Sequence, residues 1–187
     1  MTEQRRLFVI GGRPRTGKST IANRVKARRG PLEILHTDQL RPHGDDELAW
    51  QNTVNCLKTV SFAMEVLIEG VAITPSKVHS LKLDTLALES AVFLGYGRAS
   101  HADTILEPAR KAKDKDWVYG QLQANPEYES EVRSWMVAGI QQSAQLKRDA
   151  EYFGYGYFDI TDYPTFEEYA ATVTSYLLKC HTDGASR

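Results

Sequence analysis

The stretch Gly12-Arg13-Pro14-Arg15-Thr16-Gly17-Lys18-Ser19 fits the pattern G-x-x-x-x-G-K-[S/T] without a mismatch. The apolar run at residues 7–10 precedes it, and an amphipathic segment from Lys18 onward follows it. Phosphate binding requires backbone N–H groups aimed into a concavity, glycines where the chain curls, and a helix N-terminus facing the anion. This stretch supplies all three, so it predicts a phosphate-binding loop between a buried strand and a helix. The alternative is a strand-to-helix turn without a ligand.

The side chains of this loop have distinct expected roles. Lys18 is expected to reach the β- and γ-phosphates of a nucleotide as a mobile positive charge, and to be catalytic in that role. The hydroxyl of Ser19 is expected to bind a Mg²⁺ ion that bridges the same phosphate oxygens. The residues expected to contact the nucleotide are Gly12, Arg13, Pro14, Arg15, Thr16, Gly17, Lys18, Ser19 and Thr20.

Outward from the loop, short apolar runs alternate with helical patterns along the chain. The alternation predicts strands at residues 7–10, 32–35, 65–73, 91–96 and 155–160, and helices at 18–29, 47–64, 77–88, 127–153 and 165–179. Such an order is typical of a doubly wound α/β sandwich. No repeat or linker is visible, so residues 1–187 are expected to form one domain. Trp50, Trp117 and Trp135 are expected in the core, and the alternative is that they stack on a base or ring.

The composition excludes several classes of protein. Of the 187 residues, 42% are apolar and 25% are charged, which suffices for a core and does not fit a disordered or disulfide-rich chain. The apolar runs are too short to span a membrane and no secretory signal is visible, so a cytoplasmic protein is expected. The formal charge of −1 gives no general attraction to nucleic acid. Cys56 and Cys180 are expected to be reduced thiols, and the five histidines lack zinc-ligand spacing.

Three segments of the chain resemble the P-loop kinases of the adenylate-kinase-like type, which include nucleoside-monophosphate, shikimate and gluconate kinases, chloramphenicol phosphotransferase and zeta toxins. The segments are the loop at 12–19, His36-Thr37-Asp38-Gln39-Leu40-Arg41, and Val66-Leu67-Ile68-Glu69-Gly70. The resemblance covers most of the chain. It implies a three-layer sandwich whose five-stranded parallel sheet has the order 2-3-1-4-5, with ATP, Mg²⁺ and an acceptor at the carboxyl ends of the strands.

Asp38 follows the second expected strand, where a carboxylate can meet an acceptor hydroxyl. In phosphoryl transfer such a group aligns the hydroxyl and accepts its proton, and similar small-molecule kinases carry an aspartate at this place. Arg41 is expected to bind an anionic part of the acceptor or the transferring phosphoryl group. The alternative is that Asp38 caps a turn and Arg41 is solvated.

Glu69 follows three apolar residues and precedes Gly70, as does the acidic residue that ends a Walker B strand, although Glu replaces the commoner Asp. The third expected strand should lie beside the first, which would bring Glu69 close to Ser19. Glu69 is therefore expected to act on Mg²⁺ through water. Two alternatives stay open: Glu69 binds the acceptor, or it has a structural role in bonding a neighbouring loop.

The segment 98–126 is the expected place of a basic lid. Kinases of this shape close a flap over the phosphates, which excludes water and places an arginine against the developing charge. Arg110 is the expected catalytic residue of this lid, with Arg133 on the following helix in reserve. A solvated surface loop is the alternative, because acidic residues alternate with the lysines. The basic residues of the segment include Arg98, Arg110, Lys111, Lys113 and Lys115.

Together these residues predict a Mg·ATP-dependent kinase that phosphorylates a hydroxyl of a small molecule. Lys18, Ser19 and Glu69 are assigned to the donor side, and Asp38 and Arg41 to the acceptor side. A nucleotide-hydrolysing switch without an acceptor is the main alternative, although the chain lacks the N-K-x-D segment that recognises guanine. A kinase acting on a nucleotide or polynucleotide hydroxyl is a further alternative.

Overall fold

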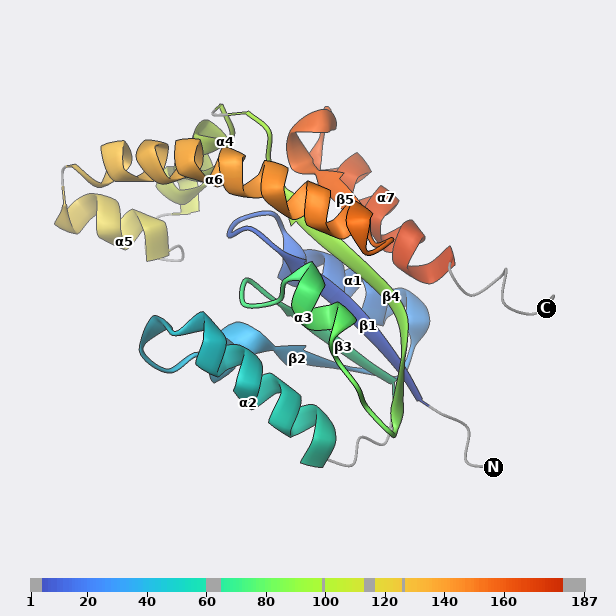
Figure 1. Ribbon diagram of the computed structural model, residues 1–187. Helices are drawn as coiled ribbons and strands as arrows, with labels where there is room; N and C mark the ends of the chain where they lie inside the picture. The colour runs from blue at the N-terminus through green and yellow to red at the C-terminus, as the bar shows by residue number, and fades with distance from the viewer. Residues whose placement is uncertain (1–4, 60–64, 99, 113–116, 126, 180–187) are drawn as a thin grey trace.

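The computed structural model describes residues 5–59, 65–98, 100–112, 117–125 and 127–179. Its five strands form one sheet in the order β2-β3-β1-β4-β5, and every neighbouring pair is parallel (Figure 1). The predicted order 2-3-1-4-5 is therefore confirmed. The strands are β1 (Arg5–Gly12), β2 (Leu32–His36), β3 (Glu65–Gly70), β4 (Leu86–Gly95) and β5 (Gly156–Asp159).

β1 is the central strand, and its apolar run is buried on both faces of the sheet. Residues 7–10 are at most 1% exposed. Leu7 and Val9 belong to one hydrophobic cluster, whereas Phe8 and Ile10 belong to another. Successive side chains of a strand point to opposite faces, so a strand covered on both sides needs an unbroken apolar run. This is why β1 could be predicted from its sequence.

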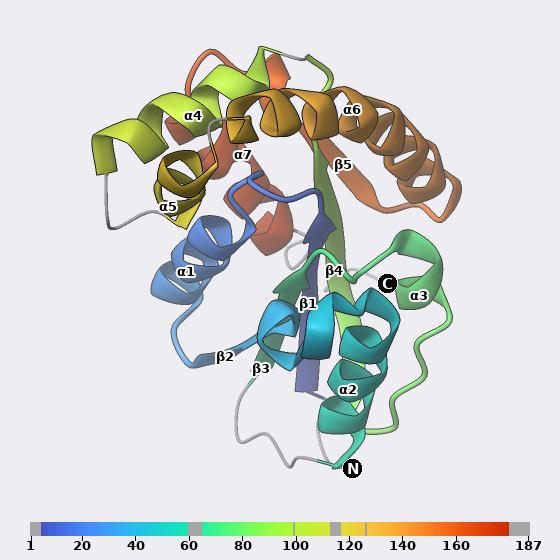
Figure 2. The ribbon, with the colours of Figure 1, turned by 90° about the vertical axis from the view of Figure 1, so that its left-hand side faces the viewer.

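Helices cover both faces of the sheet, which makes the three layers that the resemblance implies. α1 (Lys18–Arg29) and α7 (Phe166–Lys179) pack on one face. The other face is covered by α2 (Asp46–Thr59), α3 (Pro75–His79) and the C-terminal end of α6 (Tyr128–Tyr152). Figure 2 shows the strands between α1 and α7 on one side and α2 and α3 on the other.

A helical extension lies beyond the carboxyl ends of the strands. It consists of α4 (His101–Ala112), α5 (Trp117–Ala124) and the first half of α6 (Figure 1, Figure 2). These helices share a third hydrophobic cluster, to which Leu106 and Val132 belong. The segment predicted as a basic lid therefore contains two helices that were not predicted. Their apolar residues pack against α6 rather than the sheet, so they do not follow the strand–helix alternation.

The prediction of a helix over residues 77–88 is wrong. α3 ends at His79, and β4 begins at Leu86, earlier than predicted. Residues 86–88 pair with residues 5–7 of β1. The length of a strand depends on how many backbone partners the neighbouring strand provides. The local sequence does not indicate which segment will be that neighbour. Residues 60–64 of the predicted helix 47–64 lie outside the described residues.

Two further expectations can be compared with the structure. Cys56 is a free thiol, as predicted, while Cys180 lies outside the described residues. Trp50 is buried, at 8% exposure, whereas the side chain of Trp117 lies outside the described part of the chain. Among the described helices, none combines the length and the apolar character that crossing a membrane requires.

Candidate active site

The loop between β1 and α1 curls as its glycines predict. Gly12, Arg15 and Gly17 have φ values of 135°, 63° and 81°, and Arg15 is the one non-glycine with positive φ among the described residues. A Cβ atom on Gly12 would lie 2.2 Å from the carbonyl oxygen of Leu94, so the loop can approach β4 only with glycine here. The Arg13 N–H donates to that same oxygen at 2.8 Å. The loop is thus anchored to the sheet directly before the N-terminus of α1.

Lys18 is folded inward across this loop. It is 5% exposed, and its Nζ donates to the carbonyl oxygen of Arg13 at 2.8 Å. The Thr16 hydroxyl donates to the same oxygen at 2.8 Å. Burial lowers the pKa of Lys18 from 10.5 to about 8, and the carboxylates of Glu69 and Asp38 partly oppose this shift. At neutral pH the site therefore holds a buried cation that an anionic ligand would stabilise.

Glu69 connects the end of β3 to this loop. It lies opposite Ile10 of β1, so β3 is next to β1 as expected. Its Oε1 accepts a hydrogen bond from the Ser19 hydroxyl at 2.9 Å and lies 2.5 Å from Nδ1 of His36. Glu69 is only 3% exposed. Sequence reasoning brought Ser19 and Glu69 together but missed the contact with His36.

The oxygen atoms of Ser19 and Glu69 are the kind of ligand that Mg²⁺ prefers. Within the described residues, no group of three or more His, Cys, Asp or Glu side chains could hold a metal ion. A Mg²⁺ ion here would therefore need further oxygen ligands from phosphate or water. A Mg²⁺ ion that arrives bound to a nucleotide brings such ligands with it. These two residues fit such an ion.

Asp38 lies in η1 (Thr37–Leu40), directly after β2. Its Oδ1 accepts a hydrogen bond from the backbone N–H of Val71 at 3.3 Å. A Cβ on Gly70 would lie 1.8 Å from the Thr37 hydroxyl, so glycine is required for the close approach of the two segments. The carboxyl ends of β2 and β3 therefore hold Asp38 in place.

One cavity of about 1220 Å³ joins the loop to the predicted acceptor residues. Lys18, Ser19, Asp38, Arg41 and Glu69 all line it. Arg41 is also paired with Asp46 of α2, with 2.9 Å between Nε and Oδ1. The structure thus brings together residues from separate segments that the sequence assigned to a donor side and an acceptor side. Further lining residues include Tyr96, Arg98, His101, Met136, Tyr163 and Phe166.

The arginines predicted for a lid differ in whether they line the cavity. Arg98 lines the cavity, whereas Arg110 and Arg133 are not among its lining residues. Arg110 forms an ion pair with Glu129, and Arg133 pairs with the same carboxylate at 3.0 Å. A role of Arg110 at the phosphates remains a prediction. Lys113 and Lys115 lie outside the described residues.

The cavity has an aromatic wall, in which Tyr96 and His101 were not predicted. Trp135, expected in the core, is 37% exposed and lines the cavity, so that prediction is wrong. Tyr96 and His101 stack with their ring centroids 5.2 Å apart. Burial lowers the pKa of His101, which also has a hydrogen bond to the backbone of Arg15. The loop between β1 and α1 therefore touches α4, a contact that no local sequence signal could have indicated.

No family model matches this sequence, and no curated protein matches it. Solved structures are similar in fold. The gluconokinase from Sinorhizobium meliloti 1021 has a TM-score of 0.54 at 15% identity, over 92% of this chain and 91% of that one. The shikimate kinase from Bacteroides thetaiotaomicron has a TM-score of 0.56 at 17% identity, over 94% and 99% of the two chains. This protein therefore has the α/β fold of the P-loop kinases.

Proposed function

We propose that this protein is a phosphotransferase that moves the γ-phosphoryl group of Mg·ATP to a hydroxyl of a small molecule. One observation carries the proposal: Lys18 and Asp38 line the same cavity. A phosphate-binding cation and a carboxylate suited to accept a proton therefore face one space. The fold shared with a gluconokinase and a shikimate kinase supports the proposal. The cytoplasm is the expected location.

On the donor side, the loop residues 12–20 would bind the nucleotide phosphates through backbone N–H groups. Lys18 would leave the Arg13 carbonyl and follow the β- and γ-phosphates. A bound Mg²⁺ ion supplies charge neutralisation of the phosphate oxygens, and Ser19 and Glu69 would hold it. Arg98 already lines the cavity, whereas Arg110 could reach the phosphates only after it leaves Glu129.

On the acceptor side, Asp38 would accept the proton of the attacking hydroxyl. The hydroxyl oxygen bonds to the γ-phosphorus, the bond from that phosphorus to the β–γ bridging oxygen breaks, and ADP leaves with the electron pair. The N–H of Val71 orients the Asp38 carboxylate before the reaction. Arg41, held by Asp46, would bind an anionic part of the acceptor.

The test is a screen of a metabolite pool with γ-labelled ATP, followed by comparison of Asp38→Asn with the wild type. Asp38→Asn keeps the shape but removes proton acceptance, so transfer should fall by roughly 10²-fold while Mg·ATP affinity is retained. Asp84→Asn is the matched control, because Asp84 is exposed and does not line the cavity. If Asp38→Asn transferred the phosphoryl group at the wild-type rate, Asp38 would not be the residue that accepts the proton. Slow hydrolysis without any acceptor, unaffected by Asp38→Asn, would favour a nucleotide switch instead.

A further inference from the structure

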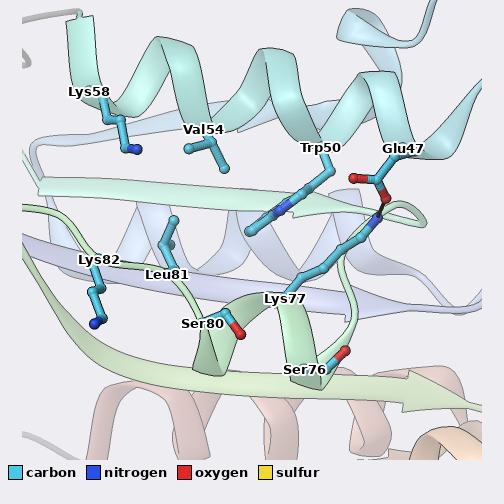
Figure 3. A pocket seen from close by; sticks show the side chains of 9 residues that line it. All are labelled: Glu47, Trp50, Val54, Lys58, Ser76, Lys77, Ser80, Leu81 and Lys82. Atoms are coloured by element: carbon cyan, nitrogen blue, oxygen red, sulfur yellow. Dashed lines mark ion pairs between the residues drawn. The ribbon is translucent and has the colours of Figure 1, made fainter.

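A second hollow, of about 510 Å³, lies between α2 and α3 and shares no lining residue with the cavity of the phosphate-binding loop. It lies on the face of the sheet opposite α1. Its volume is in the range of small-molecule sites, roughly 300–1,000 Å³. Figure 3 shows its walls, which are formed by Glu47, Trp50, Val54 and Lys58 of α2 and by Ser76, Lys77, Ser80, Leu81 and Lys82 of α3 and the segment after it.

One end of this groove is electrically balanced. Lys77 and Glu47 face one another across it and form an ion pair of 2.9 Å (Figure 3). Lys77 also donates to the carbonyl oxygen of Ala72 at 3.2 Å, and its Nζ lies 5.9 Å from the ring centroid of Trp50. These contacts compensate the charge of Lys77 and fix its side chain.

The other end of the groove carries uncompensated positive charge. Lys58 and Lys82 lie at this same end, one on each wall (Figure 3). No carboxylate in the described part of the chain forms an ion pair with either ammonium group. Two positive charges on one hollow favour an anion that enters it.

Apolar surface separates the two ends of the groove. Trp50 is 8% exposed, and the partly buried Val54 and Leu81 pack against the same hydrophobic cluster. The Ser80 hydroxyl lies beside this surface and offers one hydrogen-bond donor (Figure 3). A ligand that fills the hollow therefore meets apolar side chains along its body and positive charge at one end.

We propose that this groove binds an amphipathic anion: a small molecule with a carboxylate or phosphate group between Lys58 and Lys82, and an apolar or aromatic body over Trp50, Val54 and Leu81. Carboxylate and phosphate share the acceptor chemistry that two ammonium groups recognise. The site is separate from the cavity that holds Lys18 and Asp38, because the two hollows share no lining residue.

The test uses phenyl phosphate and benzoate as probes and the assigned indole N–H signal of Trp50 in nuclear magnetic resonance as the readout. At least one probe should shift this signal saturably, and the stronger of the two identifies the anionic group. Replacing both lysines (Lys58→Met with Lys82→Met) should weaken that binding roughly tenfold or more, the effect of losing charged hydrogen bonds. Lys26→Met on α1 is the matched control and should bind as the wild type does.

Several outcomes would overturn the proposal. The Trp50 signal could remain unmoved by both anions, or the double variant could bind as tightly as the wild type. Neutral benzyl alcohol binding as tightly as the anions would remove the role of the lysines, and inorganic phosphate binding as tightly as phenyl phosphate would remove the role of the apolar surface. Both lysines are exposed, so the double variant is expected to fold. The assay requires no phosphoryl transfer, so its failure is distinct from failure of the proposed function.

Discussion

Lys18→Met should stabilise the ligand-free protein while abolishing phosphoryl transfer. The pKa of Lys18 falls from 10.5 to about 8 because burial disfavours the ammonium group. At roughly 1.4 kcal/mol for each pH unit, holding this charge in the folded state costs about 3 kcal/mol at neutral pH. Methionine has a similar length without the charge. The free energy of unfolding should therefore rise by up to about 3 kcal/mol at pH 7 in the variant.

The pH dependence gives the sharper test. Because the folded state binds fewer protons than the unfolded state between about pH 8 and pH 10.5, the wild type gains stability as the pH rises through this window. The expected gain is about 2 kcal/mol between about pH 7.5 and pH 9.5, relative to Lys18→Met at each pH. Burial raises the pKa of Tyr157 and of Tyr169, but both proteins share this effect, so it cancels in the difference. Urea unfolding followed by tryptophan fluorescence measures both proteins, and parallel pH profiles would refute the buried-charge argument.

Three further variants test the loop, the proposed Mg²⁺-binding residue Glu69 and the helical extension. Gly17→Ala forces alanine into a φ of 81°, which should cost about 1 kcal/mol or more and weaken Mg·ATP binding in calorimetry; unchanged affinity would contradict the loop assignment. Glu69→Gln should raise the Mg²⁺ concentration for half-maximal transfer by roughly tenfold or more, and an unaltered Mg²⁺ titration would remove Glu69 from the metal site. Gly139→Ala places a Cβ 2.1 Å from the Tyr96 hydroxyl and should destabilise by about 1–3 kcal/mol, whereas Gly120→Ala, with nothing within 4 Å, should not lower the melting temperature; equal melting temperatures would contradict the tight contact.

Secondary structure was predictable where the signal is local. β1 contains the unbroken apolar run 7–10, and α1 follows a loop whose glycines adopt positive φ, so both follow from neighbouring residues. The first residues of β4 carry no such signal, because they are in a strand only through pairing with residues 5–7 of β1. The predicted helix over 77–88 failed for this reason.

The sequence by itself predicted the curled, glycine-containing loop between β1 and α1, the strand order through its resemblance to known kinases, and the approach of Ser19 to Glu69. The loop depends on contiguous residues, whereas the neighbourhood of β1 and β3 was implied by the resemblance, because these strands are not consecutive along the chain. Tertiary structure alone decided that Trp135 faces the cavity, that Arg110 pairs with Glu129, and that lysines of α2 and the segment after α3 flank one hollow. The physical reason is that helical periodicity indicates which face of a helix is apolar, but it does not indicate which other element packs against that face. An arginine or lysine likewise finds its partner only after distant segments have packed together.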